Sequence, residues 1–187
     1  MKRSVLGCLV LLGLMACEVD QKTVKTEVAA GLVAGAALNL GAITVIVPDG
    51  WQSQPPSSSM RKAQFLLSSQ DGDSEDGELA VFYFGTGSAG SIDANLDRWR
   101  GQMKGAEGDT KKSSLNGLAV TTLDITGTYV SSGPMMQGGE TKPDFRMIAS
   151  IVESPAGAYY FKLTGPQKTI AHWHVSFTQF TNSAKGS

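Results

Sequence analysis

The clearest structural signal in this chain is the stretch Tyr159-Tyr160-Phe161-Lys162-Leu163-Thr164-Gly165-Pro166. Its first five residues combine aromatic and aliphatic side chains, which favours a β-strand, and the glycine and proline then interrupt it. After the proline, apolar residues recur at spacings of three, four and three, as on one face of an amphipathic helix. These residues are Ile170, Trp173, Phe177 and Phe180. The sequence therefore predicts a strand that leads directly into a helix.

Upstream of this stretch, most apolar segments have the pattern of strands. Ala63, Phe65 and Leu67 alternate with other residues, as expected for a strand with one buried face. A helix is predicted to start after Ser91 and to end at Gly105, because apolar residues step by four, three and four and the serine can cap the first turn. The predicted strands are 43–47, 62–67, 79–84, 118–126, 145–152 and 159–163.

This order of elements predicts an α+β domain, an antiparallel sheet of about six strands with helices packed on its faces. One strand changes its apolar face along its length. Leu118 and Val120 have one parity, whereas Leu123 and Ile125 have the other. We therefore predict a β-bulge near Thr121.

Composition limits the number of domains and the classes of partner. The 187 residues suit one domain. Charged residues make up 18%, against about 25% in typical soluble proteins, and the 22 glycines suit a turn-rich sheet protein. With 16 basic and 17 acidic residues, the chain lacks the basic excess of a nucleic-acid-binding protein, so nucleic acid is not an expected partner.

The first 17 residues resemble the signal sequence of a bacterial lipoprotein. Lys2 and Arg3 give a positive start, and residues 5–15 form an apolar core too short to remain as a membrane span. The following Leu14-Met15-Ala16-Cys17 resembles the lipoprotein box. In that family the chain is cut before the cysteine, which then carries lipid. The resemblance implies that Cys17 is a membrane anchor.

Such processing divides the chain into a signal peptide (1–16), a lipidated cysteine with a flexible tether (17–41) and a single α+β domain (42–187). Residues 28–48 carry no charge, but their glycines and alanines make them poorly suited to insert in a membrane, so a tether is favoured over a second span. Residue 18 is Glu and not Asp, which in enterobacterial lipoproteins implies export to the periplasmic face of the outer membrane.

A second resemblance concerns the fold of residues 43–182. It is carried by the turn Val47-Pro48-Asp49-Gly50-Trp51, by Met60-Arg61-Lys62-Ala63-Gln64-Phe65 and by the closing Tyr160–Pro166 stretch before a tryptophan-bearing helix. This order is similar to that of uncharacterised exported bacterial proteins with the PsbP-like fold, which the DcrB lipoproteins share. The resemblance implies an α/β/α sandwich and a role as a binding or assembly accessory.

A glycine-rich loop is one candidate for ligand binding. Gly85-Thr86-Gly87-Ser88-Ala89-Gly90 has the spacing of a dinucleotide-binding loop, whose backbone amides hold phosphate at the start of a helix. Here the helix is predicted to start only after the third glycine, whereas that motif needs an earlier start. We therefore favour a flexible connection and expect no cofactor, and anion or nucleotide binding at Gly85, Gly87 and Gly90 is an alternative.

His172 and His174 are the two histidines of the chain. On a helix, residues two apart diverge by about 200° around the axis, so the pair cannot hold one metal ion, although on a strand it could. Because Trp173 belongs to the helical stripe, we favour solvated histidines. The alternative is a hydrolase or metal-dependent enzyme with a site near them.

Two loops are the preferred candidates for contact with a partner. Residues 52–59 are polar and contain two prolines, and residues 129–144 exceed the usual length of a loop. The second loop contains a methionine pair, which suits an adaptable contact surface, but its glycines and prolines equally suit disorder. The candidate partner-binding residues are Trp51, Arg61, Met135 and Met136.

These observations together predict a membrane-tethered accessory or binding module of the cell envelope. Its expected partners are the membrane, through lipid on Cys17, and an envelope protein. No catalytic motif is recognised, so we expect no enzymatic activity.

Overall fold

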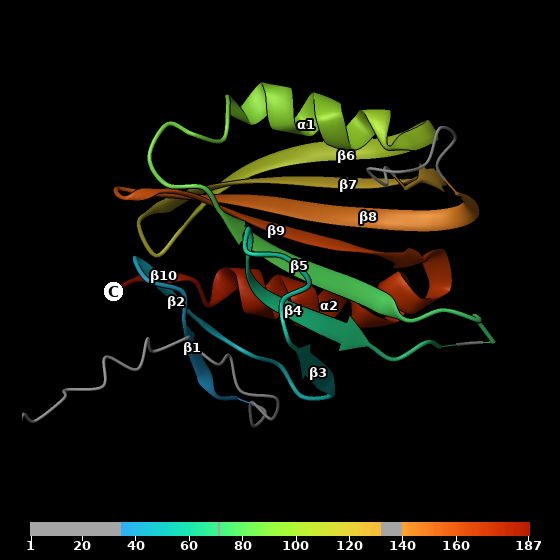
Figure 1. Ribbon diagram of the computed structural model, residues 1–187, viewed down its shortest axis with the longest axis horizontal. Coiled ribbons are helices and arrows are strands. Elements are labelled where there is room, and N and C mark those ends of the chain that lie inside the picture. Colours follow the sequence, from blue (N-terminus) through green and yellow to red (C-terminus); the bar gives the residue numbers. More distant parts are fainter. Residues whose placement is uncertain (1–34, 71, 132–139) are drawn as a thin grey trace, which may run out of the picture.

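The computed structural model describes residues 35–70, 72–131 and 140–187, which form two sheets and two helices (Figure 1). Cys17, Met135 and Met136 lie outside these ranges, so the predictions that concern them stay predictions. Neither helix in the described ranges combines the length and the apolar character needed to cross a membrane.

A seven-stranded antiparallel sheet forms the centre of the molecule, in the order β3-β4-β5-β9-β8-β7-β6. Its fourth strand, β9, runs directly into helix α2, so the predicted junction of strand and helix is confirmed. The α+β class is confirmed as well. The strands are β3 (Trp51–Gln54), β4 (Arg61–Leu67), β5 (Gly77–Tyr83), β6 (Met103–Leu115), β7 (Leu118–Val130), β8 (Thr141–Ser154) and β9 (Gly157–Pro166); the helices are α1 (Ile92–Gly101) and α2 (Gln167–Asn182).

A second, three-stranded sheet brings the two ends of the described chain together. Strand β2 (Ile43–Ile46) lies between β1 (Ala37–Asn39) and β10 (Lys185–Gly186), and both pairings are antiparallel. Leu38 and Leu40 are buried in the core. Strand β1 lies inside 17–41, the segment predicted to be a tether, so the folded domain reaches back at least to Ala37.

The large sheet buries different side chains on its two faces. On one face, Ile170, Phe177 and Phe180 of α2 pack into a core with strands β4, β5 and β9. On the other, Leu96 and Trp99 of α1 pack against β7, β8 and the Tyr160 side of β9. Figure 1 shows the two helices separated by the sheet. The expectation of helices on both faces is confirmed, and the layers are those of an α/β/α sandwich.

The predicted bulge near Thr121 is wrong. Strand β7 is regular there, with Thr121 opposite Ile151 and Thr122 opposite Ser150. Apolar residues occur on both parities of this strand because both faces of the sheet are covered. Leu118 and Val120 belong to the core under α2, whereas Leu123 and Ile125 belong to the core under α1.

The first helix ends earlier than predicted, at Gly101 rather than Gly105. Ser91 caps it as expected, because its side chain accepts a hydrogen bond of 3.2 Å from the backbone nitrogen of Ala94. Met103, whose spacing fits the helix, is instead the first residue of β6 and is buried under α1. Strand β6 was not predicted, because it is a largely exposed edge strand without an apolar face.

Two glycines of the sheet, Gly77 and Gly165, leave space for Ile170 of α2. A Cβ atom on Gly77 of β5 would lie 2.9 Å from Cδ1 of Ile170, and a Cβ on Gly165 of β9 would lie 2.9 Å from the Cα of Gly77 and 3.0 Å from the same Cδ1. Such distances are shorter than van der Waals contacts between carbon atoms. The absence of two side chains therefore determines how deeply Ile170 packs.

Gly77→Ala and Gly165→Ala should both destabilise the protein. The added methyl group meets Ile170 in the first variant, and both Ile170 and the backbone of Gly77 in the second. We expect Gly77→Ala to lower the free energy of unfolding by about 1–3 kcal/mol through overpacking. Ile170→Val removes the obstructing Cδ1, so Gly77→Ala should cost less than half as much in that background. Gly165→Ala should keep most of its cost there, because its Cβ would still lie 2.9 Å from the Cα of Gly77. Urea denaturation of the single and double variants measures this, and equal rescue of both glycine variants would contradict it.

Candidate binding groove

The sheet is wider than the helix that covers it. Seven strands about 4.8 Å apart span about 29 Å, whereas a helix with its side chains is about 10 Å wide. Helix α2 packs mainly on β9 and β8, so the outer strands of this face extend beyond it. A groove of about 780 Å³ lies between α2 and strands β6, β7 and β8.

The floor of the groove is polar. Arg146 of β8 donates two hydrogen bonds to Asp124 of β7, from Nε to Oδ1 (2.8 Å) and from Nη2 to Oδ2 (2.6 Å). The hydroxyls of Thr122 and Ser150 lie 2.8 Å apart across the same two strands. Alternate residues of a strand share a face, so these side chains all point toward α2. The floor therefore holds a fixed ion pair beside a pair of hydroxyls.

One stripe of α2 forms the wall of the groove. Its members are Gln167, Ala171, His174, Thr178 and Thr181, which recur every three or four residues. From Gln167 to Thr181, such a stripe is about 21 Å long. The Oγ1 of Thr181 is buried and has no hydrogen-bond partner within the described ranges. The wall thus carries a polar atom whose bonding capacity the fold leaves unused.

The rim of the groove carries charges of both signs from the edge strand β6. Glu107 and Asp109 lie toward one end, and Lys111 and Lys112 toward the other. Asp109 is directly opposite Asp124 in the register of β6 and β7. Like charges in such a pair repel each other, and Arg146 offsets this repulsion by binding Asp124.

The two histidines lie on α2, as the helical pattern predicts, and they point to different surroundings. His172 is exposed and its ring lies 4.8 Å from the ring of Trp173, whereas His174 lines the groove. In the part of the chain that the structure describes, no three His, Cys, Asp or Glu side chains are grouped to hold a metal ion. The alternative of an enzyme site near these histidines stays a prediction.

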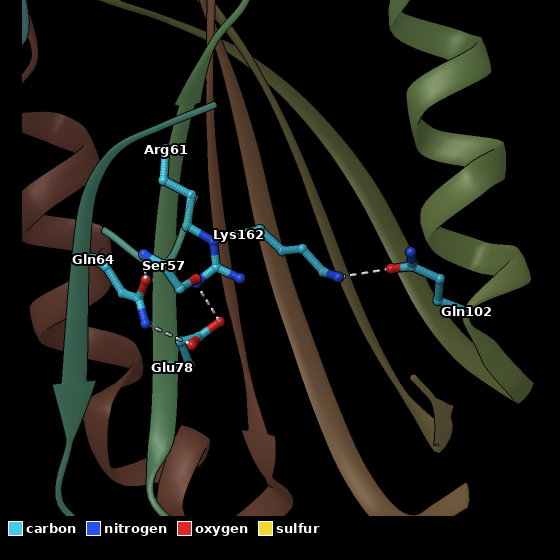
Figure 2. Close-up of polar contacts among 6 residues, drawn as sticks. All are labelled: Ser57, Arg61, Gln64, Glu78, Gln102 and Lys162. Atoms are coloured by element: carbon cyan, nitrogen blue, oxygen red, sulfur yellow. Dashed lines mark hydrogen bonds and ion pairs between the residues drawn. The ribbon is translucent and has the colours of Figure 1, made fainter. Parts of the chain in front are cut away.

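The structure separates Trp51 from Arg61, two candidates for contact with a partner. Trp51 is only 6% exposed, packs against Phe65 and Phe180, and donates from Nε1 to the hydroxyl of Ser176 (3.2 Å). It is a core residue, and residues 51–54 form strand β3 instead of a loop, so its contact with a partner stays a prediction. Arg61 lies on the other face of the sheet, in a network with Glu78 (Figure 2).

The glycine loop between β5 and α1 is fixed by local contacts. Gly85, Gly87 and Gly90 have φ values of +80°, +74° and +75°, which favour glycine. Thr86 donates from its hydroxyl to the carbonyl of Ala156 (3.1 Å), which holds the loop on the turn between β8 and β9. These contacts explain the glycines as turn residues, and ligand binding at this loop stays a prediction.

Comparison with known proteins identifies the fold. No family model matches the chain, and no curated protein matches it. Among solved structures, that of cyanobacterial PsbP (CyanoP) from Synechocystis sp. PCC 6803 is 12% identical, covers 85% of this chain and 97% of its own, and has a TM-score of 0.52. A Pseudomonas aeruginosa protein of unknown function, PA94, is 13% identical, covers 81% of this chain and 96% of its own, and has a TM-score of 0.47.

The chain has a PsbP-like fold. This confirms the expected fold, and an identity of 12% shows nothing beyond it.

The groove of this PsbP-like domain was not recognised in the sequence. Its signal is the run Thr122, Asp124 and Thr126, polar residues that alternate with the apolar Leu123 and Ile125. That pattern predicts a strand with one apolar face and one polar, solvent-exposed face. The register of β7 and β8 places Arg146 and Ser150 beside this run of polar residues. The sequence pattern of β7 alone does not reveal these neighbours.

The hydroxyl of Thr181 has no hydrogen-bond partner in the described ranges, so we expect that its replacement by valine does not destabilise the protein. An unpartnered buried hydroxyl costs stability, so Thr181→Val should leave the free energy of unfolding unchanged or raise it by up to about 1 kcal/mol. Thr169→Val is the matched control on α2, because its Oγ1 donates to Asp73 (2.8 Å) and accepts from the backbone of Gln70 (3.0 Å). The free energy of unfolding of Thr169→Val should be about 1–3 kcal/mol lower than that of the wild type. Equal losses in thermal or urea unfolding would show that Thr181 is bonded.

Proposed function

We propose that this chain is a lipid-anchored protein of the bacterial cell envelope that binds an extended segment of a partner protein in the groove between α2 and strands β6 to β8. In this proposal the chain is an accessory without catalytic activity. The length and polar floor of the groove support the proposal most strongly. The lipoprotein box at Leu14-Met15-Ala16-Cys17 supports the anchor.

The dimensions of the groove favour a polypeptide over a compact small molecule. An extended chain rises about 3.3 Å per residue, so a wall of about 21 Å accommodates about six residues. Hydroxyls and charges occur along the whole groove, where they can bond to the backbone of such a segment. Apolar side chains, among them Ile148 and Phe177, lie between them and can receive its side chains.

The proposed anchor would leave the domain free to meet its partner at a distance from the membrane. The described chain starts at Gly35, whose nitrogen donates to the carbonyl of Val47 (2.7 Å). Between Cys17 and this point, eighteen residues can extend at most about 60 Å. This reach is an upper limit, and a tether of such length would allow the groove to face away from the bilayer.

The anchor is tested by metabolic labelling with palmitate in the cells that make this protein. The wild-type chain should incorporate label and fractionate with membranes. Cys17→Ser removes the sulfur that forms the thioether, so it should do neither. Cys8→Ser is the control, because Cys8 lies within the part that processing removes, and it should be labelled as the wild type is. Equal labelling of all three, or of none, would refute the anchor.

The groove is tested by photo-crosslinking at two adjacent positions of α2. Thr178 and Gln179 are both exposed, but only Thr178 lines the groove. A photoreactive amino acid at position 178 of the full-length chain should form an adduct of defined mass in intact cells, and one at position 179 should not. Ala171→Trp fills the groove from an exposed position and should abolish the adduct. An adduct of equal yield at both positions, or one that persists with Ala171→Trp, would contradict the proposal.

A further inference from the structure

Lys162 lies in the central strand of the sheet, on the face opposite to the groove. It is paired with Ala80 on β5 and with Ala149 on β8. Alternation along β9 places its side chain on the same face as Tyr160, which belongs to the core under α1. The charged side chain therefore rises from the middle of the sheet between two of the smallest side chains.

The ammonium of Lys162 is bound by neutral groups. Its Nζ donates to Oε1 of Gln102 (2.6 Å), at the end of α1 (Figure 2). The same Nζ lies 5.2 Å from the centre of the Tyr129 ring. An ammonium has three N–H donors. Within residues 35–70, 72–131 and 140–187, none of the ion pairs includes Lys162, and Gln102 is its one side-chain acceptor.

Glu78, a carboxylate on the same face as Lys162, is already bound by other side chains. Oε1 of Glu78 lies 2.9 Å from Nη1 of Arg61, and its Oε2 accepts a hydrogen bond from Nε2 of Gln64 (3.0 Å). Figure 2 shows this pair on one side of Lys162 and Gln102 on the other. Glu78 thus balances Arg61, and the charge of Lys162 remains without a contacting counter-ion in the described structure.

Two further polar atoms on this face are buried without a hydrogen-bond partner in the described ranges. One is Nη1 of Arg61, whose contact with Glu78 is an ion pair without the alignment of a hydrogen bond. The other is Oγ1 of Thr164, two residues after Lys162 on β9 and directly opposite Glu78. Buried polar groups are nearly always bonded, so the unbonded hydroxyl of Thr164 and an ammonium without a contacting carboxylate indicate a missing acceptor, whereas Arg61 already faces Glu78.

We propose that Lys162, Arg61 and Thr164 form a binding site for an oxyanion, either a carboxylate or a tetrahedral group of the phosphate or sulfate type. Each of the three side chains can donate to a negatively charged oxygen, and hydrogen bonds between ionised groups are stronger than neutral ones. The site lies on the opposite face from the groove and does not depend on the proposed function.

The electrostatics of the site give the binding a defined pH dependence. Burial, and to a smaller extent the guanidinium groups of Arg98 and Arg61, lower the pKa of Lys162 to about 8 against the opposing effect of Glu78. Tyr129, a titratable group whose ring contacts the ammonium, has a pKa raised above its ordinary value, chiefly by burial. An anion needs the charged form of Lys162, so affinity should fall as the pH rises above about 8.

The experiment uses the full-length chain and measures its melting temperature in sulfate against sodium chloride of equal ionic strength. Sulfate stays fully ionised between pH 6 and pH 10, so a change of affinity in this interval belongs to the protein. Sulfate also stabilises proteins by exclusion from their surface, an effect common to all variants. We therefore compare the shift of the melting temperature in sulfate between the wild type and Lys162→Met, and take the difference of the two shifts. The methionine keeps the length of the side chain without its charge.

We expect this difference to be positive at pH 7 and to disappear as the pH rises from 8 to 10. Lys62→Met is the matched control, because Lys62 is an exposed lysine of the same sheet whose Nζ lies 5.7 Å from the Tyr83 ring, and it should keep the full shift. Thr164→Val should weaken binding about two- to tenfold, as expected for one lost hydrogen bond. Acetate in place of sulfate distinguishes the two classes of anion, because only a site that accepts carboxylates responds to it.

Two results would overturn the proposal. One is an equal shift for wild type and Lys162→Met, which would attribute the whole effect of sulfate to exclusion. The other is a wild-type shift that does not change between pH 6 and pH 10, because the ammonium would then not take part. If Lys162→Met fails to fold, the pH profile of the wild type alone still decides.

Discussion

The close contact of Ile170 with Gly77 and Gly165 fixes the position of α2, and much of the remaining structure depends on it. An α-helix that approaches a sheet over two missing side chains cannot slide sideways without meeting side chains on the neighbouring strands. Because this contact holds α2 over the central strands of the sheet, the strands toward β6 remain uncovered on this face, and the groove lies there. The same contact closes the core that contains Phe65, Phe161 and Phe180.

Much of the fold could be predicted from the sequence because its signals are local. The junction at Gly165-Pro166 and the cap at Ser91 involve neighbouring residues only. The missed elements depend on distant partners. Strand β6 has no apolar face of its own and forms by pairing with β7, and β1 pairs with β2 beside the far end of the chain. Similarly, the first turn of α2 is bonded by Asp73, ninety-six residues away from Thr169.

The candidate sites were harder to predict because each depends on register. Trp51 looks like a contact residue beside a polar segment, yet pairing of Trp51 with Leu67 carries its ring into the core. Lys162 looks like the solvated residue of a half-buried strand, and its unusual surroundings appear only when Ala80 and Ala149 are placed beside it. Sequence periodicity indicates which face of the sheet a side chain occupies, but it does not indicate which residues lie next to it on the neighbouring strands.

The division of the apolar side chains into two cores has a consequence for the dynamics of this domain. The core under α1 contains fewer buried residues, whereas the core under α2 joins both sheets. Regions with fewer buried contacts open at a lower free energy than the whole molecule. Backbone amides of α1 should therefore exchange with deuterated solvent through local opening, while those of α2 remain protected until global unfolding.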